Sequence, residues 1–195
     1  MSDLMRWRYG ETNPVVLAVD SATVIEIGDL IYQETDDARP ASQQTDQLTE
    51  EANQSLLAIK FVGVAMQRSR SGDTTPIRVA TSGVFEMVCP SATFEVGALV
   101  GASEAGSGTA LEDQQVEGVL RPELAIGLVA KRVASAATSV LIEILSRVYG
   151  KPIANEPRYT ANTETLAGNK TLVCDDAFYQ VLDPGGAGRN VVLPK

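Results

Sequence analysis

Apolar and polar positions alternate along this chain in a pattern that occurs twice. Residues 22–32 read ATVIEIGDLIY, and residues 92–102 read ATFEVGALVGA. With Gly28 aligned on Gly97, a glutamate and an aliphatic residue precede each glycine, and a pair of aliphatic residues follows one position later. A glycine between two short apolar runs indicates a tight turn between strands. Both stretches therefore predict a strand, a glycine turn and a second strand.

A second pair of matching stretches follows the first. Residues 62–65 read VGVA and residues 126–129 read IGLV, which aligns Gly63 with Gly127. A strand-like run comes after each, at 75–79 and at 138–144. The chain thus contains two copies of one β unit. We expect them to complete one closed or nearly closed β structure with an internal pseudo-twofold, because neither half could bury its apolar face alone. The alternative is that short β-turn-β segments resemble one another by chance.

One helix and further strands complete the expected domain. Apolar residues at helical spacing predict a helix over residues 48–61, capped by Thr45, with Asn53 and Gln54 on its solvent face. Pro90 is expected to end a strand over 84–89. The other expected strands are 15–19, 24–32, 62–66, 77–81, 94–102, 116–120, 125–131 and 140–145. Residues 33–47 and 101–108 are expected to be exposed loops, and residues 134–138 fit a helical turn or a loop equally.

These patterns divide the chain into an N-terminal arm (1–14), a β domain with the internal repeat (15–150), and a linker with a small terminal β unit (151–195). The terminal unit reads as strand, turn, strand, turn, strand. The expected fold class is mainly β: one closed or nearly closed β domain with one short helix and a small C-terminal β appendage.

The N-terminal arm differs in composition from the rest of the chain. It carries the single tryptophan of a protein whose formal net charge is −9. Tryptophan, tyrosine and arginine are enriched at the energetic centres of protein interfaces. The arm is therefore expected to bind a partner; the alternative is a frayed terminus with accidental composition. The candidate binding residues are Met5, Arg6, Trp7, Arg8 and Tyr9.

Composition limits the partners and the compartment. With 195 residues and 44% hydrophobic residues, the chain can bury a core. Its acidity disfavours direct binding to nucleic acid, because phosphates would be repelled. Cys89 and Cys174 are too few for a disulfide framework and read as buried free thiols. No apolar run is long enough to span a membrane, and residues 1–10 lack the apolar region of a signal peptide, so we expect a protein that stays where it is made.

The sequence offers little for catalysis. It contains no histidine, which removes Ser-His-Asp and Cys-His arrangements and histidine-bearing zinc sites. The carboxylate pairs at 36–37, 50–51 and 175–176 fit solvated surface better than a catalytic pair, and Asp73 reads as a turn residue. Glu26 and Glu95 occupy equivalent places in the two copies, where charges on the rim of each turn are the simpler interpretation. We expect no enzyme activity, no cofactor and no metal.

Several of these stretches together resemble a known family. They are FVGVAMQRSRSGDTTPIRVATSGVFEM (61–87), ATFEVGALVG (92–101), AIGLVAK (125–131) and EIGDLIYQ (26–33). This combination resembles the head decoration proteins, or capsid cement proteins, of tailed phages, over about residues 15–149. The tail over 165–194 is similar to terminal β segments of various phage structural proteins.

The resemblance implies a β-barrel or β-tulip-like domain, assembled as a homotrimer on the outer surface of the expanded phage head. There it would clamp neighbouring subunits of the major capsid protein, with an extended N-terminal arm that reaches onto the shell; residues 5–9 are placed there by position alone. One alternative is another virion part, such as a tail or fibre component attached through the terminal β unit. A second, from a different class, is a small acidic hydrolase that uses aspartate or glutamate, with or without a metal.

Overall fold

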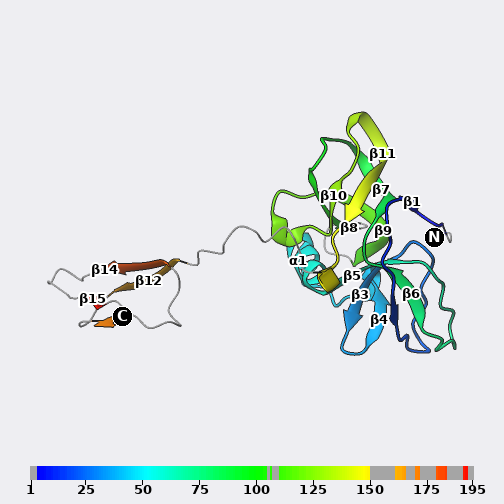
Figure 1. The fold of residues 1–195 in the computed structure, drawn as a ribbon, viewed down its shortest axis with the longest axis horizontal. Coiled ribbons are helices and arrows are strands. Elements are labelled where there is room, and N and C mark those ends of the chain that lie inside the picture. The colour runs from blue at the N-terminus through cyan, green and yellow to red at the C-terminus, as the bar shows by residue number, and fades with distance from the viewer. Residues whose placement is uncertain are drawn as a thin grey trace. The chain divides into compact units, whose positions relative to one another are not determined.

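The structure is a computed structural model that describes residues 4–104, 106 and 110–149, together with the backbone of four short strands near the C-terminus (Figure 1). The chain forms two compact units, Met1–Ile153 and Ala154–Lys195. In the second unit, β12 (Ala161–Thr165) pairs in parallel with β14 (Tyr179–Asp183), and β13 (Lys170–Thr171) pairs in parallel with β15 (Val191–Val192). This arrangement differs from the expected three successive strands. Cys174 and the acidic pair at 175–176 lie outside the described residues.

The first half of the main unit closes into a small barrel. Its strands are ordered β2-β6-β5-β3-β4, and a parallel bridge between Ala18 and Asp37 joins the two ends of that order. Their bounds are β2 (Val15–Leu17), β3 (Leu30–Glu34), β4 (Asp37–Pro40), β5 (Phe61–Ala65) and β6 (Ile77–Ala80). The expected β-barrel is confirmed, although β4 and a 3-10 turn (Ala41–Gln43) occupy much of the predicted loop at 33–47.

The second half repeats this architecture. The order is β7-β11-β10-β8-β9, and a parallel pairing of Val88 with Gln115 joins β7 to β9. The strand bounds are β7 (Val84–Phe94), β8 (Leu99–Glu104), β9 (Leu111–Gly118), β10 (Gly127–Val129) and β11 (Val133–Ile144). Short 3-10 turns at Pro122–Leu124 and Arg147–Tyr149 complete this part. The structure therefore differs from the expectation of one barrel built jointly, because each half closes its own ring of strands.

The two barrels share equivalent hydrogen bonds at the aligned glycines. The amide of Gly28 donates to Ala65 O (2.9 Å), and that of Gly97 donates to Val129 O (2.8 Å). Both glycines have positive φ, +99° and +81°, which a residue with a side chain adopts only at a cost. In the same way, Ile31 pairs with Gly63, and Val100 pairs with Gly127. The sequence repeat and the structural repeat therefore coincide residue by residue.

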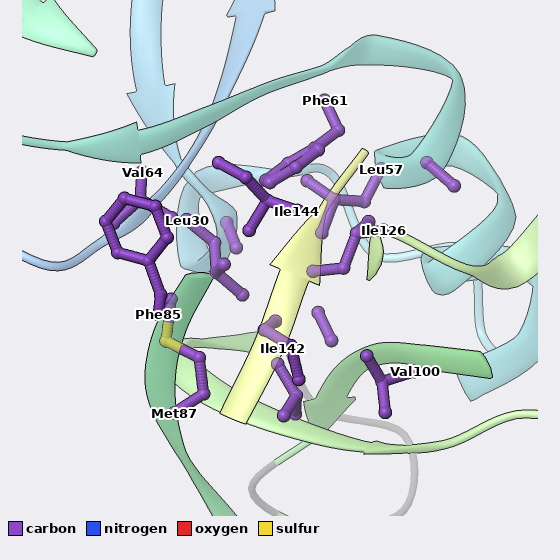
Figure 2. Close-up of a cluster of buried hydrophobic side chains, with 14 of the residues drawn as sticks. Leu30, Leu57, Phe61, Val64, Phe85, Met87, Val100, Ile126, Ile142 and Ile144 are labelled. Carbon is purple, nitrogen blue, oxygen red and sulfur yellow. The ribbon is translucent and has the colours of Figure 1, made fainter. Parts of the chain in front are cut away.

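The core explains why the barrels remain together. One buried cluster lies in the first barrel alone and includes Ile31, Val62 and Val79. A larger cluster combines residues of both barrels. Figure 2 shows part of it, with Leu30 and Val64 of the first barrel beside Phe85 of the second. Separating the barrels would expose these side chains to water, which is unfavourable by roughly 25 cal/mol per Å² of apolar area.

The single helix, α1 (Glu50–Lys60), is shorter than predicted and turned differently. Leu48 has a left-handed φ of +69°, so the helix begins later, and Thr49 rather than Thr45 is the N-cap. Asn53 and Gln54, expected on the solvent face, are only 1% and 2% exposed, whereas Ile59 is 65% exposed. The predicted packing face is therefore wrong. The amides are buried because they bond to groups on the second barrel, as described below.

Strands β7 and β11 also run further than predicted. Strand β7 continues through Pro90, and the undecided residues 134–138 belong to β11. The register between these strands shifts on each side of Ala137. Proline is tolerated at such irregular points because its missing N–H removes no ladder hydrogen bond there. The predicted loop at 101–108 likewise begins as strand, since β8 extends to Glu104.

Candidate functional site

The predicted binding residues lie along the second barrel. Strand β1 (Trp7–Tyr9) pairs antiparallel with β7, and Trp7 lies opposite Phe85 (Figure 1). The amide of Glu86 donates to Arg6 O (2.8 Å), which extends the contact by one residue. Residues 4–9, named here the N-terminal segment, are therefore packed on the main unit. In this segment the structure differs from the expected separate arm over residues 1–14.

Large apolar side chains of the N-terminal segment nevertheless face solvent. Their exposed fractions are 50% for Leu4, 46% for Met5, 41% for Trp7 and 50% for Tyr9. The Trp7 indole donates to Gly10 O (3.0 Å), which fixes the ring without covering it. A contiguous group of exposed apolar and aromatic side chains marks an interaction surface more often than a bare exterior. This surface is named the aromatic strip, with the members Leu4, Met5, Trp7 and Tyr9.

Arg6 points the other way and fixes the segment to both barrels. Its Nε and Nη2 donate to Gln114 Oε1 on β9, at 3.1 and 2.6 Å. Gln114 Nε2 in turn donates to Asp29 Oδ1 (2.8 Å), beside the glycine turn of the first barrel. The amide of Leu4 donates to Ile27 O (3.2 Å) in the same turn. The N-terminal segment thus bridges the first and second barrels.

Burial changes the acidity of Asp29. The residue is 3% exposed, and this burial raises the pKa of its carboxyl to about 6, although hydrogen bonds from Gln114 and from the Glu26 amide oppose the shift. Desolvation also lowers the pKa of the Arg6 guanidinium, while the nearby charges of Asp29 and Glu86 oppose that change. A buried carboxyl held by the Gln114 side-chain amide and the Glu26 main-chain amide fits a structural polar network.

The structural glycines have distinct roles. A Cβ on Gly28 would lie 2.6 Å from Leu4 O, whereas a Cβ on Gly97 would meet nothing within 4 Å. On Gly63, the added atom would lie 1.7 Å from Ala80 O, and on Gly127 it would lie 2.8 Å from Glu143 O. Gly63 and Gly127 therefore allow neighbouring strands to approach, and Gly28 makes room for the N-terminal segment, which Gly97 does not.

Arg8 forms an ion pair on the surface. Its Nη2 lies 2.5 Å from Glu86 Oε2, with side-chain exposures of 46% and 34%. The hydrogen bond from Arg8 lowers the pKa of the Glu86 carboxyl, and a bond from Ser139 adds to this. Exposed pairs of this kind contribute little to stability. Arg8 is consequently available to a partner at small cost to the fold.

A second polar cluster lies where α1 meets the second barrel, and no sequence pattern predicts it. Asn53 Nδ2 donates to Glu104 Oε1 (2.8 Å), and Gln54 Nε2 donates to Glu117 Oε1 (2.7 Å) and to Ala102 O (3.0 Å). Burial is the largest cause that raises the pKa of the Glu117 carboxyl to about 7, and the nearby Glu50 carboxyl raises it further. These carboxylates hold the helix onto the barrel through its amides.

The remaining candidate residues have structural roles. The two carboxylate oxygens of Glu95 accept hydrogen bonds from Arg132 Nε at the surface (3.0 and 2.9 Å). Glu95 and its counterpart Glu26 do not form a common site. Asp73 Oδ1 accepts from the Thr75 amide (2.8 Å), as a turn residue does. Cys89 is a buried free thiol, as predicted, and burial raises its pKa.

Among residues 4–104, 106 and 110–148, no group of three or more His, Cys, Asp or Glu side chains is arranged to hold a metal ion. No helix in the described part of the chain has the length and apolarity needed to cross a membrane. No protein-family model matches the chain, and no curated protein matches it.

Proposed function

We propose that this protein is a non-enzymatic virion component of a tailed phage, which binds the outside of the expanded head and stabilises it by clamping subunits of the major capsid protein. The proposal rests on the sequence resemblance described above and on one structural observation. That observation is the aromatic strip, which is exposed although its backbone is held by strand pairing and by Arg6.

A strip that is already ordered suits a clamping role. Binding through a preorganised surface avoids much of the entropy that a disordered arm would lose. Strand β1 is also the terminal strand of its sheet order, so within the described residues its outer edge has no strand partner. An extended segment of a neighbouring subunit could add to that edge through main-chain hydrogen bonds.

Trimeric assembly would strengthen such contacts. A protein that binds only the expanded lattice stabilises that lattice by mass action. Three linked copies raise the effective concentration of each weak contact, so affinity grows without any larger surface on one chain. We therefore propose a homotrimer, whose mass in solution can be measured by light scattering.

The test is binding to purified expanded heads, measured by co-sedimentation. We expect the double variant Trp7→Ala with Tyr9→Ala to lose most of its binding, while Leu120→Ala binds as the unaltered protein does. Leu120 is a suitable control because it is 96% exposed and does not belong to the aromatic strip. Deleting residues 1–12 is a weaker test, since it also removes Arg6, which bonds to Gln114. Binding by the double variant at full strength would contradict the role of the strip.

One observation favours a second candidate. Residues Ala154–Lys195 form a compact unit of their own. A separate terminal unit suits attachment of a tail or fibre component, which is the alternative virion role. Labelling assembled particles separates the two proposals, because the label appears on heads in the first case and on tails in the second.

A further inference from the structure

An open groove of about 710 Å³ lies beside the N-terminal segment. Arg8 and Tyr9 of the segment line it, as do Glu86 of β7 and much of the first half of β11. Glu86 lies opposite Leu141 in the β7–β11 register, and Leu141 also lines the groove. The groove therefore follows β11 and is reached from β7 at Glu86. Its residues are far apart in sequence, so no local motif marks it.

The charge of this groove is opposite to that of the chain. Its cations are Arg8, Lys131 and Arg132, and Glu86 is its single carboxylate. The whole chain has a formal net charge of −9. Oppositely charged patches steer association and select partners. A ligand that carries carboxylates is therefore attracted to this groove and repelled by most of the remaining surface.

The cations differ in how much of their charge is already neutralised. Arg8 is paired with Glu86, and Arg132 is paired with Glu95. Lys131 is exposed and forms no ion pair within the described residues. An incoming carboxylate would meet its strongest uncompensated attraction at Lys131, and Arg8 also lines the groove.

Shape and composition favour a polypeptide over a small anion or a nucleic acid. The groove is open, and Tyr9, Val133 and Val140 add apolar surface to its lining. Small anions cannot use that apolar surface. A nucleic acid carries a phosphate at every nucleotide, so the part that extends beyond the groove would meet the strongly acidic protein around it.

The geometry points to this groove as the docking site for an extended, acidic segment of a partner protein, with carboxylates at Lys131 and Arg8 and apolar side chains against Tyr9. The inference deepens the proposed function and rests on it for the identity of the partner as a capsid subunit. Break points in the β7–β11 register, on either side of Ala137, lie along the same groove. Such irregularities often re-aim side chains at functional sites.

The test uses a fluorescent ten-residue peptide of alternating glutamate and threonine, followed by anisotropy with the full-length protein at low salt. We expect saturable binding that Lys131→Glu weakens at least about fivefold, because one reversed charge in the groove repels the ligand it attracted. Arg78→Glu is the matched control. It changes the net charge equally and is exposed, but it belongs to β6 of the first barrel.

Each outcome decides the inference. Equal weakening by both variants would show a general charge effect and overturn it. Tighter binding of single-stranded oligothymidylate than of the peptide would also overturn it, in favour of a polyanion site. Head binding that Lys131→Glu leaves intact would retain the proposed function and reject this groove as the capsid contact. Peptide binding that depends on Lys131, in a protein that does not bind heads, would retain the groove and reject the proposed function.

Discussion

Arg6 and Gln114 are joined by two hydrogen bonds, although 108 positions separate them in the sequence. Gln114 uses its other amide atom to reach Asp29 Oδ1, so one glutamine links the N-terminal segment, the second barrel and the first. The side chains of the aromatic strip in the same segment remain exposed. The same six residues therefore stabilise the body and present a surface to a partner.

The first prediction concerns this glutamine. Gln114→Ala removes the acceptor of Arg6, and it leaves Asp29 Oδ1 buried without its partner while Asp29 Oδ2 keeps the hydrogen bond from the Glu26 amide. We expect the free energy of unfolding to fall by about 2 to 3 kcal/mol, since an unsatisfied buried polar group loses its solvation without compensation. Urea denaturation measures the change. Arg8→Ala is the control, and because its ion pair is exposed we expect a loss of less than about 1 kcal/mol. Equal losses in the two variants would refute the linkage.

The second prediction compares two glycines at equivalent turns. Gly97→Ala should cost about 1 to 2 kcal/mol, the cost of a left-handed backbone for a residue with a side chain. Gly28→Ala should cost more, because its Cβ would also lie 2.6 Å from Leu4 O. It should in addition displace the N-terminal segment and change the fluorescence of Trp7, the only tryptophan. Unchanged emission in Gly28→Ala, with a cost equal to that of Gly97→Ala, would speak against this contact.

These glycines also show what the sequence could predict. Glycine is required at a turn with positive φ and where two strand backbones lie in contact. Gly28 and Gly63, with their counterparts Gly97 and Gly127, can therefore be recognised from their spacing. The repeat, the mainly β class and the presence of one helix follow from such local signals. The closing of each half into its own barrel does not, because it depends on single parallel bridges such as that between Ala18 and Asp37.

The errors arise where distant groups decide the outcome. The buried face of α1 could not be predicted from the spacing of apolar residues within the helix. Asn53 and Gln54 face inward because they bond to Glu104 and Glu117, on strands far along the chain. The attachment of the N-terminal segment depends on Gln114 in the same way. The candidate surface was recognisable from its composition, whereas its docking on β7 and the adjacent groove were not.

The third prediction concerns pH. Folding raises the pKa of Glu117 to about 7 from its ordinary value of 4.5. The native state therefore holds a proton that the unfolded state releases, and stability falls as pH rises from about 4.5 to about 7. Glu117→Gln keeps an acceptor for Gln54 and removes this dependence. We expect it to stabilise the protein at pH 8 by about 1 kcal/mol, a value reduced for partial solvation of the side chain.

Asp29 contributes a dependence of the same sign, because its pKa is raised to about 6 from 3.8. Glu117→Gln should therefore lower the slope between about pH 4.5 and 7, with the dependence of Asp29 remaining below about pH 6 and a nearly flat profile between 6 and 7. Unfolding in urea at a series of pH values gives both profiles. A variant whose profile is as steep as that of the unaltered protein would contradict the assignment to Glu117.

The fourth prediction concerns cooperativity between the barrels. Leu30 belongs to the first barrel but is buried in the cluster shared with the second. Leu30→Ala should lower the free energy of unfolding by about 2 to 5 kcal/mol through the cavity it leaves. Because the cluster is shared, the loss should also shift the transition reported by Trp7, which pairs with the second barrel. Val79→Ala is the comparison variant, because Val79 belongs to the cluster that lies in the first barrel alone. Leu30→Ala could instead move the transition seen by circular dichroism and leave the transition reported by Trp7 in place. In that case the barrels unfold independently, and the shared core does not hold them together.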